Sequence, residues 1–189
     1  MNRVLVITNR YPCDADDPAS PFVPHYVQAL KSCGVDVDVL TPRYTHRPRC
    51  VEPDFIHRFD TGASSPVGSW NLASPASWMR LRRFVMAGHQ LGRQLCQTRS
   101  YDHILAMWAL PSGEFAYRLS REFGIPYSTW CLGSDIYSWA KKPVIKGQIA
   151  RVLKESTHVF ADGDDLCERV KNWLTINCVF MASFRPLDG

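Results

Sequence analysis

The chain has 189 residues, the length of one ordinary domain or of one domain with a short tail. A composition of 46% hydrophobic and 21% charged residues is that of a globular protein with a real core, which excludes disordered, collagen-like and disulfide-scaffold chains. The formal net charge of +4 is too small for a protein that coats nucleic acid, so no nucleic-acid partner is expected.

The positive charge is concentrated in one part of the chain. Residues 61–101 contain no aspartate or glutamate but five arginines, at positions 80, 82, 83, 93 and 99. A local basic surface suggests an anionic partner such as a lipid, a sugar phosphate or RNA, whereas a solvated surface is the plain alternative.

The cysteines and the apolar runs indicate a compartment. Seven cysteines are scattered singly, without a Cys-x-x-Cys pair or the spacing of a zinc site, which predicts reduced thiols. The first apolar run is too short for a secretory signal, and no run approaches the ~18 residues of a membrane span. We therefore expect a cytoplasmic protein.

The first elements form a strand, a helix and a second strand. Val4–Ile7 is a continuous apolar run, typical of a strand buried on both faces of a parallel sheet, and we expect it to be central. Apolar residues then recur at helical spacing over 22–30, and this pattern stops at Gly34. A strand is expected over 35–40, ended by Pro42. Such a unit predicts a right-handed crossover between parallel strands.

The same alternation continues to the end of the chain. After a weak strand signal over 55–59, the expected helices are 78–96, 112–123, 144–155 and 165–173, and the expected strands are 103–108, 126–131, 158–161 and 177–181. This order predicts an α/β fold, a Rossmann-like doubly wound parallel sheet of six or seven strands with helices on both faces.

In such a sheet the ligand lies outside the carboxyl ends of the strands, where the strand order reverses. The loop after the first strand lacks Gly-x-Gly-x-x-Gly, which argues against a nucleotide-dependent oxidoreductase or epimerase. The chain also has no Gly-Lys-Ser/Thr phosphate loop, no Gly-x-Ser-x-Gly elbow and no His-Glu-x-x-His pair.

Two later loops carry groups suited to an anion or a sugar. The segment WALPSG opens a helix at its proline and places Gly113 in the first turn, where backbone N–H groups are free. In the segment LGSD, Gly133 and Ser134 let backbone amides face an anion, and Asp135 can accept hydrogen bonds from sugar hydroxyls. Gly-Ser-Asp is also ordinary turn chemistry.

These residues carry a resemblance to a known family. The opening VLVITNRYPCDADDPASPFVPHYVQALKSCGVDVDVLTP resembles the start of group 1 (family 4-like) GT-B glycosyltransferases. The stretch HILAMWALPSGEFAYRLSREFGIPYSTWCLGSDIY is similar to that family's strand, Trp with Pro-x-Gly, helix, Gly-Ile-Pro, strand and His-Gly-Ser-Asp. STHVFADGDDLCERV resembles the strand and helix that follow, so the likeness covers almost the whole chain.

The resemblance implies the N-terminal half of a GT-B fold. Residues 1–181 would be the Rossmann-like acceptor-side domain, and 182–189 would begin the linker to a C-terminal donor domain that is absent. The implied activity is retaining transfer of a sugar from a nucleotide-sugar to a glycan or lipid-linked acceptor, and the domain alone is expected to be inactive. No metal and no cofactor are implied, because the nucleotide-sugar is a substrate.

The resemblance also implies site residues. Arg10 and Tyr11 stand where the family places acceptor or phosphate contacts, and an arginine fork suits phosphate. The candidates are Asp135 as the catalytic group and, for substrate binding, Arg10, Tyr11, Trp108, Gly113, Gly133 and Ser134.

Two positions depart from the family pattern. Leu132 and Met107 stand where members commonly have histidines, and neither side chain can donate a hydrogen bond to a sugar hydroxyl. A non-catalytic module that binds a glycan or a partner protein therefore remains an alternative.

Two other segments have a plain and a functional interpretation. Asp14, Asp16 and Asp17 favour a polar turn over a metal site, because no fourth ligand is in view. The segment 78–86 is basic and amphipathic, so it suits peripheral contact with an anionic membrane or, more simply, a helix packed on the sheet.

Overall fold

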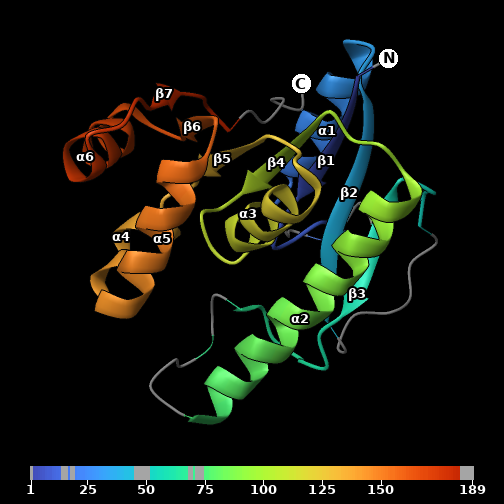
Figure 1. Ribbon diagram of the computed structural model, residues 1–189, viewed down its shortest axis with the longest axis horizontal. Coiled ribbons are helices and arrows are strands. Elements are labelled where there is room, and N and C mark those ends of the chain that lie inside the picture. Colours follow the sequence, from blue (N-terminus) through green and yellow to red (C-terminus); the bar gives the residue numbers. More distant parts are fainter. Residues whose placement is uncertain are drawn as a thin grey trace.

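The computed structural model describes residues 2–13, 17, 20–44, 52–67, 70 and 75–183. Within these residues the chain forms one parallel sheet of seven strands in the order β3-β2-β1-β4-β5-β6-β7 (Figure 1). The strands are β1 (Arg3–Ile7), β2 (Asp36–Arg43), β3 (Ile56–Asp60), β4 (His103–Met107), β5 (Tyr127–Cys131), β6 (His158–Ala161) and β7 (Val179–Phe180). The predicted fold class is confirmed, although β4 rather than β1 is the middle strand.

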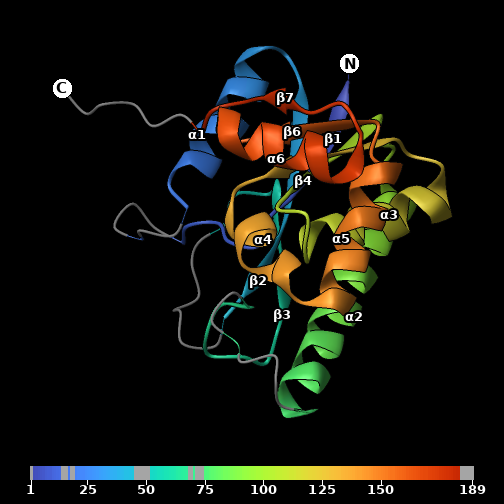
Figure 2. The same ribbon diagram turned by 90° about the vertical axis from the view of Figure 1, so that its left-hand side faces the viewer.

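Helices cover both faces of the sheet. They are α1 (Phe22–Ser32), α2 (Pro75–Thr98), α3 (Ser112–Phe123), α4 (Ser134–Tyr137), α5 (Pro143–Glu155) and α6 (Asp164–Leu174), with a 3₁₀ turn η2 (Trp139–Lys141). The helix α1 packs on one face through Val23 and Val27, whereas the other helices share the larger core on the opposite face. Figure 2 shows α1 and α3 on opposite sides of β1.

Most observed boundaries differ from the expected ones by one to three residues, and those of β2 and β7 have a structural reason. The strand β2 continues through Pro42 to Arg43, although Pro42 was expected to end it. Pairing with β1 stops at Leu40, so the missing N–H of Pro42 leaves no partner on β1 unsatisfied, while β3 still pairs alongside. The last strand is shorter than predicted, because only Val179 and Phe180 pair with β6.

The helix α2 approaches the core closely at Gly88. A Cβ atom there would lie 2.7 Å from Phe115 Cζ and 3.0 Å from Phe59 Cζ, so only glycine lets the helix lie on these rings. One turn earlier, the ring of Phe84 stacks on Phe115 with centroids 5.8 Å apart. These aromatic contacts fix α2 against α3 and the sheet.

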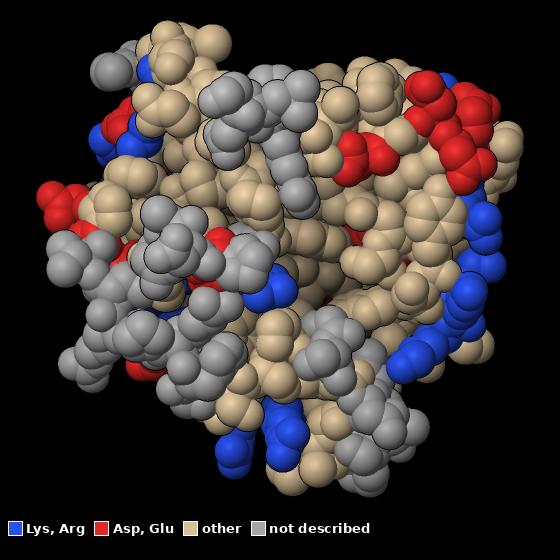
Figure 3. All heavy atoms as spheres, turned by 180° about the vertical axis from the view of Figure 1, so that it is seen from behind, with Lys and Arg blue, Asp and Glu red and all other residues tan. Residues whose placement is uncertain are grey.

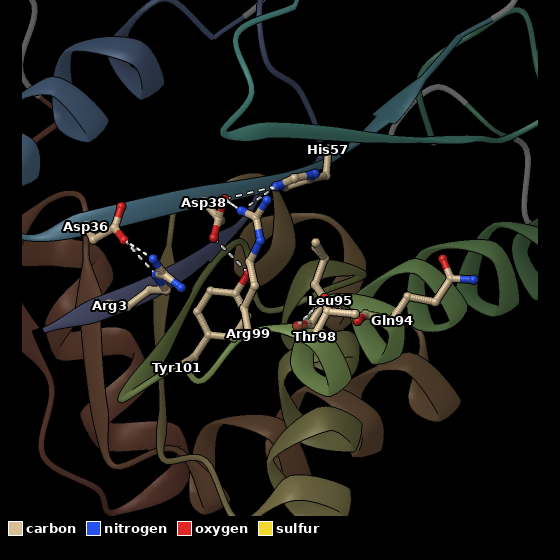
Figure 4. A network of polar contacts seen from close by, with 9 residues as sticks. All are labelled: Arg3, Asp36, Asp38, His57, Gln94, Leu95, Thr98, Arg99 and Tyr101. Carbon is tan, nitrogen blue, oxygen red and sulfur yellow. Dashed lines mark hydrogen bonds and ion pairs between the residues drawn. The ribbon is translucent and has the colours of Figure 1, made fainter.

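A buried polar network lies where β2, β3 and the segment after α2 meet (Figure 4). Asp38, only 3% exposed, accepts hydrogen bonds from Tyr101 Oη at 2.9 Å and from Arg99, and its Oδ1 lies 2.9 Å from His57 Nε2. Burial alone would raise the pKa of Asp38, but the hydrogen bonds from His57, Arg99 and Tyr101 lower it to about 2. The network therefore ties three segments together through one ionised carboxylate.

The cysteines differ in oxidation state. Those at positions 33, 96, 131, 167 and 178 carry free thiols, whereas Cys13 is disulfide-bonded. The expectation of reduced thiols is therefore wrong at Cys13. Among the described residues, no helix is both long and apolar enough to cross a membrane.

Candidate functional site

The strand order reverses between β1 and β4. The chain leaves β1 toward β2 and leaves β4 toward β5. The loop after β1 therefore diverges from the loops after β4 and β5, and a crevice opens between them at the carboxyl ends of the strands. A cavity of about 400 Å³ lies there, which we call the cleft, and Figure 3 shows the molecule hollowed near the centre of this side. Its lining includes Asn9, Arg10, Tyr44, Trp108, Leu110, Ser134, Asp135, Ser138 and Trp139.

Trp108, which directly follows β4, has an unusual backbone conformation. Its φ is +74°, a value that bulky residues adopt only where surrounding contacts impose it. The backbone on both sides is held, because Trp108 N donates to Trp130 O at 2.9 Å and Trp108 O accepts from Gly113 N at 3.1 Å. The cleft thus presents a strained tryptophan at the point where a ligand is expected.

Asp135 holds that conformation in place. Its carboxylate is 2% exposed and accepts hydrogen bonds from Ala109 N at 2.8 Å and from Ile136 N at 3.1 Å. Burial raises the pKa of Asp135, and the backbone N–H groups act in the opposite direction. The side chain joins the loop after β5 to the loop after β4, next to Trp108.

Asn9 is a site residue that the sequence analysis missed. Its Oδ1 accepts a hydrogen bond from Ser112 Oγ at 2.7 Å, and its Nδ2 donates to Leu110 O at 3.3 Å. Its backbone oxygen accepts from Tyr44 Oη at 3.3 Å. A polar residue two positions after the apolar run of β1 was the available signal, because the loop after this strand lies at the switch point.

Four of the seven predicted site residues line the cleft: Arg10, Trp108, Ser134 and Asp135. Arg10 forms no ion pair with any of the described residues, which leaves a cationic group at the cleft wall. Tyr11 lines a different hollow, where its backbone oxygen accepts a hydrogen bond from Arg58 at 3.1 Å.

The two predicted glycines support the site without lining the cleft. Gly133 has a φ of +101°, a turn conformation that L side chains rarely adopt, and it precedes α4. Gly113 is buried where α3 crosses α5, and a Cβ there would lie 2.7 Å from Val152 Cγ1 and 3.4 Å from Trp108 O. Its role in the structure is close packing beneath Trp108.

Replacing Gly113 by alanine should therefore destabilise the protein by about 1–3 kcal/mol, because Val152 is fully buried and cannot give way freely. Thermal unfolding followed by circular dichroism measures this change. The matched control is Gly147→Ala in α5, where nothing lies within 4 Å of the new Cβ and helix propensity should stabilise by roughly 0.5–1 kcal/mol. Equal melting temperatures for the two variants would contradict the packing role.

The two positions that depart from the family pattern also do not line the cleft. Met107 is fully buried and packs in the core on the α1 side of the sheet. Leu132 is half-buried and packs against the same core. The aspartates at 14 and 16 lie outside the described residues, whereas Asp17 Oδ2 accepts a hydrogen bond from Cys13 N at 3.2 Å.

Comparison with known proteins identifies the family. Residues 19–174 match the glycosyl transferase 4-like domain, so the chain belongs to this family of group 1 GT-B glycosyltransferases. The resemblance seen in the sequence is thereby confirmed. A search of curated protein sequences finds no significant match.

Solved structures share the fold at low sequence identity. Sucrose-phosphate synthase from Thermosynechococcus elongatus matches with a TM-score of 0.68 and 15% identity, over 96% of this chain and 48% of that one. Os79 from O. sativa in complex with UDP matches at 0.62 and 12%, over 96% and 52%. UDP-GlcNAc 2-epimerase from Neisseria meningitidis bound to UDP-GlcNAc matches at 0.58 and 12%, over 95% and 46%. The chain therefore spans about half the length of these proteins.

Proposed function

We propose that the chain is the acceptor-side half of a retaining glycosyltransferase, which moves a sugar from a nucleotide-sugar to a hydroxyl of a glycan or lipid-linked acceptor. The observation that carries the proposal is the cleft at the β1/β4 switch point, in a chain of this family. Its wall holds a strained Trp108 and Arg10, which forms no ion pair with the described residues. Residues 1–181 form this half, and 182–189 begin the connection to a donor-binding half.

Four residues that line the cleft have a proposed role. The guanidinium of Arg10 binds an anionic group of a substrate, and the hydroxyl of Ser134 hydrogen-bonds an acceptor hydroxyl. Trp108 offers a ring face on which a sugar can pack. Asp135 positions the Trp108 loop through Ala109 N, and a direct contact between its carboxylate and the acceptor is the alternative that the sequence pattern predicts.

The proposed location at a membrane surface rests on the arginines of residues 61–101. Of the five arginines in 61–101, Arg93 pairs with Glu122 and Arg99 with Asp38. The other three, at 80, 82 and 83 on α2, are exposed and form no ion pair with the described part of the chain. They support peripheral contact with an anionic membrane, in a protein located in the cytoplasm at the inner membrane surface.

Two other functions remain as alternatives. A non-catalytic glycan- or partner-binding module is supported by Leu132 and Met107, which provide no hydrogen bond at the positions of the family's histidines. A nucleotide-sugar epimerase is suggested by the fold of the epimerase neighbour. Transfer of labelled sugar to an acceptor, assayed in a protein with both halves of the cleft, separates the transferase from both alternatives, because only a transferase forms a new glycoside.

The 189-residue chain alone should bind UDP- or GDP-sugars with a dissociation constant of about 1 mM or weaker, since the proposed function assigns donor binding to the other half of the cleft. Isothermal titration calorimetry measures this affinity. The same titration with a protein that carries both halves is the control, and we expect micromolar binding there. Micromolar binding to the chain alone would contradict the assignment of donor binding to the other half.

A further inference from the structure

A second hollow, of about 390 Å³, lies beside the cleft and is bounded by α2, α3, α5 and η2. We call it the α2–α5 groove. Its wall is largely apolar and includes Trp78, Leu81, Val85, Met86, Pro111 and Ile145. Its volume is in the range of small-molecule sites, which are typically lined by apolar side chains with a few polar groups.

The groove and the cleft adjoin each other, because Leu110 and Trp139 line both of them. A ligand that fills both must therefore have an apolar part and a polar part. A free sugar fits the cleft but leaves the groove unused.

The charged side chains of the groove and the cleft favour binding of an anion. The one acidic side chain of the groove, Glu114, is neutralised by Arg118 Nε at 2.8 Å and by the guanidinium of Arg151 at 2.7 Å. In contrast, Arg82 in the groove and Arg10 in the cleft form no ion pair with the described residues. Asp135 also lines the cleft, but its carboxylate is buried and accepts hydrogen bonds from Ala109 N and Ile136 N. Within the described residues, the groove and the cleft therefore present two arginines without an ion pair beside an apolar wall.

The rim of the groove is apolar and open to water. Trp78 is 41% exposed and Met86 is 58% exposed, although both lie on a helix whose opposite side is packed in the core. Covering such side chains with a hydrocarbon chain is favourable, because apolar surface of both partners then leaves water.

We propose that the α2–α5 groove binds the hydrocarbon chain of an anionic amphiphile whose polar head lies in the cleft. The substrate class is then an acceptor in which a hydrocarbon chain joins the head through a phosphate. The assignment of this amphiphile as the acceptor rests on the proposed function, whereas its binding to the groove does not.

The proposal is tested by titrating the chain with three compounds below their critical micelle concentrations: dodecyl phosphate, dodecyl maltoside and inorganic phosphate. Calorimetry gives the affinity, and tryptophan fluorescence gives a second readout because Trp78 and Trp139 line the groove. Dodecyl phosphate should bind with one-to-one stoichiometry and at least about tenfold more tightly than either other compound, because only it satisfies both the apolar wall and the free arginines.

Two methionines of α2 provide a matched pair of variants. Met86 lines the groove, whereas Met79 is 62% exposed on the same helix and does not line it. Met86→Glu should weaken binding of dodecyl phosphate about tenfold or more, and Met79→Glu should leave it unchanged. Arg82→Gln should remove most of the preference for dodecyl phosphate over dodecyl maltoside.

Three results would overturn the proposal. Non-saturable binding would mean that the groove holds no chain, and equal affinity for dodecyl phosphate and dodecyl maltoside would mean that no anion is recognised. Equal weakening by Met79→Glu and Met86→Glu would mean that α2 lies on a lipid surface instead, which anionic phosphatidylglycerol vesicles would then confirm. Sugar transfer to a soluble acceptor by the two-half protein tests the proposed function separately, since it does not require the groove.

Discussion

Replacing Asp135 by asparagine should lower the melting temperature by about 4–8 °C and slow sugar transfer about 100-fold in a protein that carries both halves of the cleft. The amide cannot accept hydrogen bonds at both positions, so either Ala109 N or Ile136 N loses its charged acceptor. A lost hydrogen bond to a buried charged group costs roughly 1.5–3 kcal/mol. The loop that carries the strained Trp108 then relaxes, and the cleft loses its shape.

Differential scanning calorimetry and a transfer assay, run well below the lowered melting temperature, measure the two effects together. Asp165→Asn is the matched control, because its carboxylate is exposed and only accepts a hydrogen bond from Tyr137 Oη. If the melting temperature of Asp135→Asn stays unchanged while transfer falls 100-fold, the carboxylate contacts the acceptor directly and the positioning role is wrong.

The second prediction with a large expected effect concerns the contribution of Asp38 to the stability of the fold. Because its pKa in the folded protein is about 2, below the ordinary value of 3.8, this carboxylate stabilises the fold above about pH 4 and loses that contribution as the pH falls to 2. The contribution is about 2 kcal/mol. Asp38→Asn should cost about 2–4 kcal/mol at pH 7, because His57, Arg99 and Tyr101 lose a buried anionic partner.

Urea unfolding at pH 7 and at pH 3 measures this difference, which should be smaller at the lower pH. The control is Asp36→Asn, which removes a carboxylate that is 40% exposed and pairs with Arg3 on the surface, and we expect a loss below about 1 kcal/mol. A loss that is equal for both variants, or that is independent of pH, would contradict the role of the Asp38 network.

The sheet could be predicted from the sequence because each strand is a short apolar run between helical patterns. Patterns of this kind do not define elements of one turn, so α4 and η2 were missed, although both line the cleft or the groove through Ser134 and Trp139. The two-residue β7 was overestimated at both ends: Asn177 and Cys178 precede the paired residues, and Met181 follows them, although its N–H still donates to Ala161 O at 2.9 Å.

The site could be predicted only where a loop directly follows a strand. Arg10, Trp108 and Ser134 occupy such loops and line the cleft. Tyr44 and Trp139 reach it by packing between distant segments, which no local pattern reveals. A second basic stretch was available in the sequence, because residues 136–154 contain five lysines and arginines and no acidic residue. It includes all of α5 except Glu155, and Ile145 of this helix lines the groove together with residues of α2.

Because α2 contacts the core closely at Gly88, a small tilt of the helix at this contact displaces its N-terminal part by a larger distance. Trp78 lies ten residues before that contact, about 15 Å along the axis, so a tilt of about 5° at Gly88 moves it by about 1 Å. The rings of Phe59 and Phe115, on which Gly88 rests, therefore set the width of the α2–α5 groove from a distance. Replacing Phe115 by a smaller or larger side chain would therefore change the width of the groove, and with it the size of ligand that fits, without changing any residue that lines it.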